Sequence, residues 1–100
     1  MEKHSNLNKI QNLSERNELV ENFKNEIAKL SVKSLNNQIK KLNFLCLELD
    51  PYNAIDLSQE EENILNEFSL KSFLSNPFDF TNIILQLLDS AETELKTRSH

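Results

Sequence analysis

The chain has 100 residues, 38% of them apolar, and a formal net charge of −5 at pH 7. This length fits a single domain with one modest core and excludes a deep substrate cavity. Glycine is absent. Because glycine reaches positive φ without steric cost, its absence disfavours tight β-hairpins and excludes the glycine-rich loops that hold phosphates and dinucleotides. The composition therefore predicts an all-α fold.

The cysteine content and the hydropathy indicate where the protein resides. The single cysteine, Cys46, cannot form an intramolecular disulfide, which is typical of a reducing compartment. No apolar run reaches the length of a membrane span, about 18 residues, and the first residues have no signal-like apolar stretch. We therefore expect a cytoplasmic protein that does not enter a membrane.

The first third of the chain predicts a flexible arm followed by a helix. Residues 1–13 are mostly polar, and we expect them to form the arm. Ser14 is the predicted N-cap of the helix, because Glu15 and Glu18 place acidic side chains in the turn that follows. The helix carries an apolar stripe at a helical spacing, formed by Leu13, Val20, Phe23, Ile27 and Leu30.

A second apolar stripe has the alternating steps of four and three residues that are typical of a heptad seam. It consists of Ala28, Val32, Leu35, Ile39, Leu42, Cys46 and Leu49. Because it is one residue out of register with the first stripe, either two helices meet near residues 31–34 or one long helix turns its buried face there. No proline or glycine forces a break, so we favour one long helix. Its end, residues 42–49, is apolar nearly all round and is expected to be buried on more than one side, and Asp50-Pro51 terminates it.

Two further helix starts are indicated after residue 57. Ser58 and Glu61 have the spacing of a capping box. The apolar face of that helix begins with Ile64, Leu65 and Phe68 and continues with Leu70, Phe73 and Leu74. A kink or a second short helix is expected near Ser69 and Ser72.

The last helix is predicted to begin at Asn76-Pro77, because asparagine is a good N-cap and proline suits the first helical position. Its apolar face consists of Phe80, Ile84, Leu87, Leu88, Ala91 and Leu95. Lys96 and Arg98 lie at its C-terminal end, where cations are favoured. Residues 96–100 are expected to fray.

These elements predict one domain over residues 1–100, an all-α bundle of three to five helices. A single long N-terminal helix, or an antiparallel pair of helices in its place, would pack against a C-terminal helical hairpin. The seam over residues 28–49 would span about 33 Å, which is long for a monomer with a radius of gyration of about 13 Å. We therefore expect part of this seam to pack against a second copy or another protein.

No group of residues in the sequence indicates catalysis or metal binding. The two histidines, His4 and His100, lie near the chain ends, so they do not complete a zinc site or a nucleophile pair with Cys46. Cys46 itself is predicted to be a buried structural thiol. The consecutive carboxylates of residues 60–62 point in different directions on a helix and do not converge on one ion. We expect no enzymatic activity, cofactor, metal or small-molecule substrate.

We expect instead a protein-binding module that acts as a small regulator, adaptor or inhibitor, with another protein or a second copy as its partner. Aromatic residues are enriched at interface hot spots, and several lie around the corner at Asp50-Pro51. The predicted partner-binding residues are Phe44, Leu45, Leu47 and Tyr52. The remaining aromatic residues near the two loops, Phe73, Phe78 and Phe80, either close the ends of the bundle or anchor a partner.

The alternative function is nucleic-acid binding by the basic stretch between Lys24 and Lys41. Lys29, Lys33 and Lys40 would share one side of a continuous helix, as phosphate contacts require. The chain is acidic overall, however, and it lacks a basic-region zipper or a glycine turn between two helices. Protein binding is therefore the favoured function.

Overall fold

The computed structural model describes the backbone of residues 2–98 and the side chains of residues 14–98. Its elements are α1 (Glu2–Ile27), α2 (Val32–Glu48), η1 (Pro51–Asn53), α3 (Gln59–Glu67), η2 (Lys71–Ser75) and α4 (Pro77–Arg98), where η marks a 3-10 helix. No strand occurs within this range. The predicted all-α bundle of three to five helices is confirmed.

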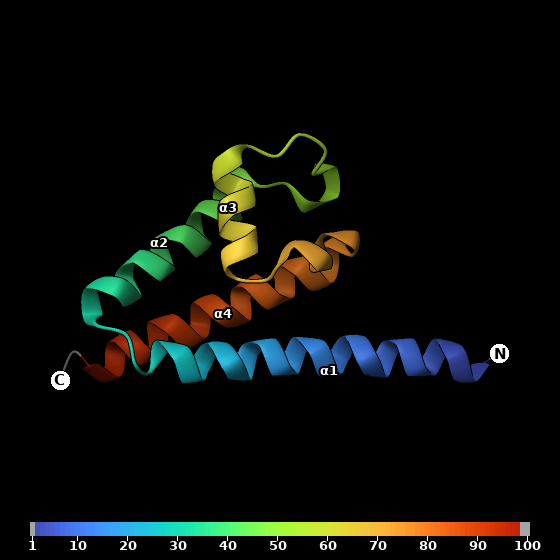
Figure 1. Ribbon diagram of the computed structural model, residues 1–100, viewed down its shortest axis with the longest axis horizontal. Helices are drawn as coiled ribbons and strands as arrows, with labels where there is room; N and C mark the ends of the chain where they lie inside the picture. The colour runs from blue at the N-terminus through green and yellow to red at the C-terminus, as the bar shows by residue number, and fades with distance from the viewer. Residues whose placement is uncertain (1, 99–100) are drawn as a thin grey trace.

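Helix α4 is the central element of the fold. Both α1 and α2 pack against it, on different sides, and α3 contacts α2 and η2 (Figure 1). The N-terminal part of α1 projects past the start of α4, so that the start of α1 and the end of α4 lie at opposite ends of the long axis (Figure 1). Because of this projection, the radius of gyration is 14.7 Å and the longest dimension is 52 Å.

The core is apolar throughout and centres on α4. Among the described side chains no polar or charged residue is buried. Helix α4 contributes Phe80, Ile83, Ile84, Leu87, Leu88 and Ala91. The other elements add Val20, Phe23, Ile27, Leu35, Leu42, Leu45, Leu49, Ile64, Leu65, Phe68 and Leu70. The predicted apolar face of the last helix is thus buried, except that Leu95 is only partly covered.

The favoured prediction of one long helix is wrong, because α1 ends at Ile27 and α2 starts at Val32. The N-cap of α2 is Ser31, whose hydroxyl accepts a hydrogen bond from the backbone N–H of Ser34 at 3.1 Å. The break falls where the two apolar stripes lose register. It allows one stripe to pack on one side of α4 and the other stripe on a different side.

The predicted seam of α2 is only partly correct. Leu35, Leu42 and Leu49 are buried and Ile39 is half-buried, but Ala28, Val32 and Cys46 are exposed. Ala28 lies in the turn before α2. Further along, Leu45 and Cys46 lie on opposite sides of the line through Leu42 and Leu49, and it is the Leu45 side that packs into the core. The segment 42–49 is therefore buried on one side only, and Leu47 is 83% exposed.

The start of α1 also differs from the prediction. The helix begins at Glu2, so residues 2–13, predicted to be an arm, have a helical backbone and Ser14 lies within the helix instead of capping it. No proline or glycine interrupts this stretch. Val20, Phe23 and Ile27 of the predicted stripe are buried, whereas the side chain of Leu13 lies outside the described residues. In the predicted frayed tail, Lys96 to Arg98 belong to α4, and residues 99 and 100 lie outside the described range.

The other helix signals are confirmed. In the capping box of α3, the Ser58 hydroxyl accepts from the Glu61 N–H at 3.1 Å, and a Glu61 carboxylate oxygen accepts from the Ser58 N–H at 2.8 Å. Asn76 caps α4 by accepting from the N–H of Asp79 at 3.3 Å. Between these helices Ser69 adopts a φ of 58°, a conformation that costs energy in a non-glycine residue. The chain turns there and forms the second short helix, η2.

The two arginines of the chain connect α1 to the two ends of α4. Near the start of α4, the Arg16 guanidinium lies 3.4 Å from a carboxylate oxygen of Asp79. In the last turn of α4, Arg98 donates to the carbonyl oxygen of Ile27, the last residue of α1, and to those of Ala28 and Leu30 in the turn that follows. Its Nε also contacts the Glu94 carboxylate at 3.1 Å. Arg98 thus satisfies carbonyl groups that have no partner within α1.

We predict that Arg98→Ala lowers the free energy of unfolding by about 1–3 kcal/mol, because the change removes hydrogen bonds from a charged, partly buried donor. Urea unfolding followed by circular dichroism measures this loss. Lys96→Ala, an exposed position in the same turn, is the matched control, with an expected change below about 0.5 kcal/mol. Equal losses in the two variants would contradict the role assigned to Arg98.

A second prediction concerns the capping box. Ser58→Ala removes the acceptor for the Glu61 N–H and should lower the free energy of unfolding by about 1 kcal/mol. Ser58→Asp replaces the hydroxyl acceptor with a carboxylate acceptor and should keep most of the stability. Thermal unfolding of the three proteins compares them, and an equal loss in both variants would show that the cap does not stabilise α3.

Candidate protein-binding surface

Apolar side chains exposed to solvent gather where α2 ends and α4 begins. The exposed large apolar residues are Val32 (48%), Leu47 (83%), Tyr52 (75%), Ile55 (81%), Phe78 (68%) and Leu85 (54%). All except Val32 lie on the last turn of α2, the following loop or the first half of α4. Because η1 packs against α4, these segments are neighbours. We call Leu47, Tyr52, Ile55, Phe78 and Leu85 the α2–α4 corner.

A shallow apolar cleft of 190 Å³ lies between the end of α2 and the first half of α4, and Leu85 is the corner residue that lines it. It is lined by Leu45, Cys46, Leu49, Pro51, Phe80, Thr81, Ile84 and Leu85. Its base consists of core residues, so it is preformed, and Leu85 is an exposed part of its rim. Phe78 lies seven residues before Leu85, which places both on the same side of α4, two turns apart.

Local sequence explains why this corner is exposed. Leu45 and Leu49 form the buried side of α2, and Leu47, two residues from each, points to the opposite side. The Asp50 carboxylate then accepts a hydrogen bond from the backbone N–H of Tyr52 at 3.0 Å, which caps η1. The backbone of Tyr52 is therefore held while its ring remains solvent-exposed.

The four predicted partner-binding residues are found in two different environments. Leu45 is fully buried and lines the base of the cleft, whereas Phe44 is half-buried against the core. Leu47 and Tyr52 are exposed. Leu45 is removed from the predicted contact set, because a side chain with no accessible surface does not touch a partner.

Two residues of the corner, Ile55 and Leu85, were not among the predicted site residues. Phe78 belonged only to the wider group of loop aromatics. A usable signal was present, because Phe78 and Leu85 are seven residues apart and both fall off the predicted apolar face of the last helix. Apolar residues that a helix does not need for its own core are candidates for contact with a partner.

Cys46 is exposed, so the prediction of a buried thiol is wrong. It lies beside the buried face of α2 and lines the corner cleft. Partial burial by the neighbouring side chains raises the pKa of the Cys46 thiol above its ordinary value. A raised pKa lowers the thiolate fraction at neutral pH and hence the reactivity of the group.

The predicted basic face is interrupted by the break between α1 and α2. Lys29 lies in the turn, whereas Lys33 and Lys40 lie on α2, so the three exposed lysines do not share one continuous helix. The neighbouring Lys41 is bound to the Glu67 carboxylate at 2.8 Å. The prediction that these three lysines form one continuous face is therefore wrong. Of the three, only Lys33 and Lys40 lie on one side of the same helix.

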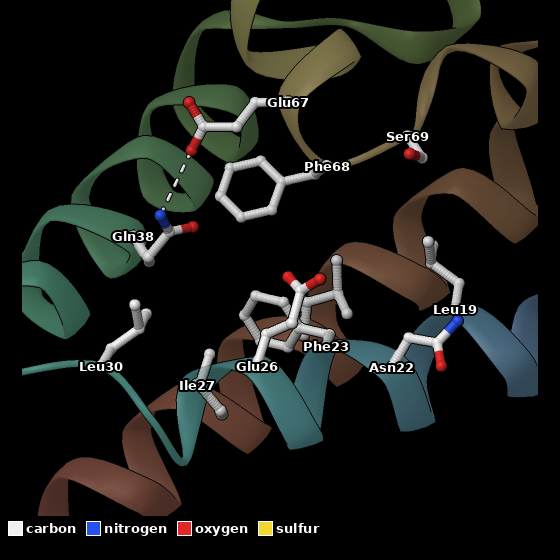
Figure 2. Close-up of a pocket in the computed structure, with 11 residues that line it drawn as sticks. Leu19, Asn22, Phe23, Glu26, Ile27, Leu30, Gln38, Glu67, Phe68 and Ser69 are labelled. Atoms are coloured by element: carbon white, nitrogen blue, oxygen red, sulfur yellow. Dashed lines mark hydrogen bonds between the residues drawn. The ribbon is translucent and has the colours of Figure 1, made fainter.

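A second depression, which we call the α1 groove, separates α1 from α2 and α3 and has a volume of 270 Å³. It is lined by Leu19, Asn22, Phe23, Glu26, Ile27, Leu30, Gln38, Glu67, Phe68, Ser69 and Leu87. The rings of Phe23 and Phe68 meet within it, with centroids 6.0 Å apart. Figure 2 shows the Glu26 carboxylate pointing from α1 into the space between the helices, and Gln38 donating a hydrogen bond to Glu67 on the other side.

The described part of the chain contains no metal site and no membrane-spanning helix. Among the described side chains, no three His, Cys, Asp or Glu residues are grouped so as to hold a metal ion. Within the described range, none of the helices combines the length and the apolar character that crossing a membrane requires. Comparisons with protein-family models, curated proteins and solved structures gave no match to this chain.

The raised pKa of Cys46 gives a testable prediction. Near neutral pH the folded chain should react with iodoacetamide more slowly than the urea-unfolded chain. As the pH is raised, the alkylation rate of the folded chain should increase at a higher pH than that of the unfolded chain. Alkylation rates across a pH series, followed by mass spectrometry, measure both effects. If the alkylation rate of the folded chain rises at the same pH as that of the unfolded chain, or at a lower one, the raised pKa of Cys46 is contradicted.

Proposed function

We propose that this protein is a non-enzymatic protein-interaction module and that its binding surface is the α2–α4 corner. The observation that supports this most is a set of five large apolar side chains, each at least 54% exposed, on the last turn of α2, the loop after it and the first half of α4. An apolar cleft, with Leu85 in its lining, lies between the same segments. Exposed apolar patches of this kind mark protein contact sites. The role we propose is a small cytoplasmic regulator, adaptor or inhibitor.

The corner has the properties of an interface anchor. Tyr52 and Phe78 offer large apolar areas with few rotatable bonds, so a partner gains buried surface at a low cost in side-chain entropy. Burying one such side chain fully is worth about 1.5–3 kcal/mol. The base of the cleft, formed by Leu45, Leu49 and Phe80, is already packed in the core. Little reorganisation is therefore needed on binding, which favours affinity.

The partner in this proposal is another protein or a second copy of the chain. A nucleic acid is less well supported because only Lys33 and Lys40 of the predicted face share a helix side. Lys41 is held by Glu67, and the net charge of −5 repels phosphates.

The proposal is tested with a double variant at the corner, Leu47→Ser with Tyr52→Ser. Both side chains are exposed, so the helix content should be retained. Capture of partners from the source cytoplasm by the tagged chain, quantified by mass spectrometry, should fall about tenfold or more. If the partner is a second copy, sedimentation equilibrium of the purified chain should show self-association that the double variant weakens.

Val32→Ser is the matched control, since it removes an exposed apolar side chain far from the corner, at the start of α2. It should leave capture and self-association unchanged. Loss in the control as great as in the double variant, or no loss in either, would contradict the proposal. Loss only on charge reversal of Lys33 and Lys40 would favour nucleic-acid binding instead.

A further inference from the structure

We infer that the α1 groove is a second docking site and that its occupant is an amphipathic helix of another protein, with a Lys or Arg beside its apolar stripe. None of the residues that line this groove belongs to the α2–α4 corner or lines its cleft, so the inference does not depend on the proposed function. It rests on the shape, the lining and the charge of the groove.

The shape of the groove follows from the way α1 is attached. Helix α1 packs mainly against α4 through Val20, Phe23 and Ile27 and is held at its two ends by Arg16 and Arg98. It therefore stands apart from α2 and α3, which pack on the other side of the core (Figure 1). The resulting space is an open trough between helices, a shape that a further helix fills.

The base of the groove is apolar. Phe23 and Phe68 meet there, and Ile27 and Leu87 complete it. Leu19 and Leu30, which are only partly buried, lie at its two ends in Figure 2. Side chains at a helical spacing on a partner would cover this surface and complete the burial of both leucines.

The rims of the groove are acidic, but the two carboxylates are not equivalent. Glu67 is already neutralised, because the Lys41 ammonium lies 2.8 Å from it and Gln38 donates to it at 3.2 Å. Glu26 on the α1 rim forms no ion pair with any described side chain and is exposed. An unpaired carboxylate beside an apolar base favours a partner that brings a cation together with apolar side chains.

The alternatives to a basic amphipathic helix fit less well. An extended peptide that adds a strand needs the edge of a sheet, and the described part of the chain contains no strand. An acidic partner would face Glu26 directly and would be repelled by the net charge of −5.

The experiment uses the full chain labelled with ¹⁵N and two synthetic helical peptides of about 15 residues. Both peptides carry the same leucine stripe, flanked by lysines in one and by glutamates in the other. The lysine peptide should shift backbone amide resonances in residues 19–30 and 66–70, and the glutamate peptide should not. Equal shifts with both peptides, or shifts that map only outside the groove, would overturn the inference.

Three variants make the test specific to the groove. Glu26→Gln should weaken the lysine peptide about two- to fivefold, the effect expected of a partly exposed ion pair. Glu92→Gln, an exposed carboxylate on α4, is the matched control and should have no such effect. Asn22→Arg, at an exposed position one turn before Glu26, places a cation and extra bulk at the rim and should abolish binding.

The same variants identify the other possible occupant. If the unliganded chain self-associates in sedimentation equilibrium and Asn22→Arg abolishes that association, the groove binds a second copy and the inferred partner is wrong. If Glu26→Gln and Glu92→Gln weaken the lysine peptide equally, the binding is a general attraction to an acidic surface and the inference fails.

Discussion

The packing of α4 is the constraint on which the rest of this structure depends. One helix buries side chains toward α1 and toward α2, which have few contacts with each other. Six of its residues, Phe80, Ile83, Ile84, Leu87, Leu88 and Ala91, lie in the core. Because α1 and α2 meet the rest of the molecule mainly at α4, apolar surface remains open between the elements. The corner cleft and the α1 groove both follow from this arrangement.

The two arginines show how polar contacts complete an apolar fold. Arg16 and Arg98 connect α1 to the two ends of α4, and Arg98 supplies donors to carbonyl groups at the end of α1 and in the turn that follows. The C-terminal turn of α4 is therefore part of the tertiary structure. These contacts fix the position of α1 and so set the width of the α1 groove.

Local sequence signals predicted part of this fold, and tertiary packing decided the rest. The capping box at Ser58 and the Asn76-Pro77 start were predictable because the residues that satisfy each helix end lie within a few positions of it. The break near Ser31 was only one of two alternatives, because the change of register between the apolar stripes fits both a helix end and a turned helix, and no proline or glycine decides between them. The carbonyl groups freed there are satisfied by Arg98, about seventy residues away in sequence.

The candidate surface was predictable to a similar extent. Leu47 and Tyr52 lie near a corner that Asp50-Pro51 marks in the sequence, and both are exposed. Leu45 was predicted to contact a partner but is buried, and Cys46 was predicted to be buried but is exposed. The buried side of a short helix depends on which neighbouring elements cover it, and the sequence does not show this. Phe78 and Leu85 join the surface only through the contact between η1 and α4, which is not visible in the sequence.

Hydrogen exchange of the chain, measured with and without the partner recovered by capture, tests most directly whether the α2–α4 corner is the binding surface. Partner binding should slow amide exchange in residues 44–57 and 77–86 and leave the start of α2 unchanged. Slowed exchange confined to residues 32–41, with the corner unaffected, would contradict the assignment of the binding surface to the corner.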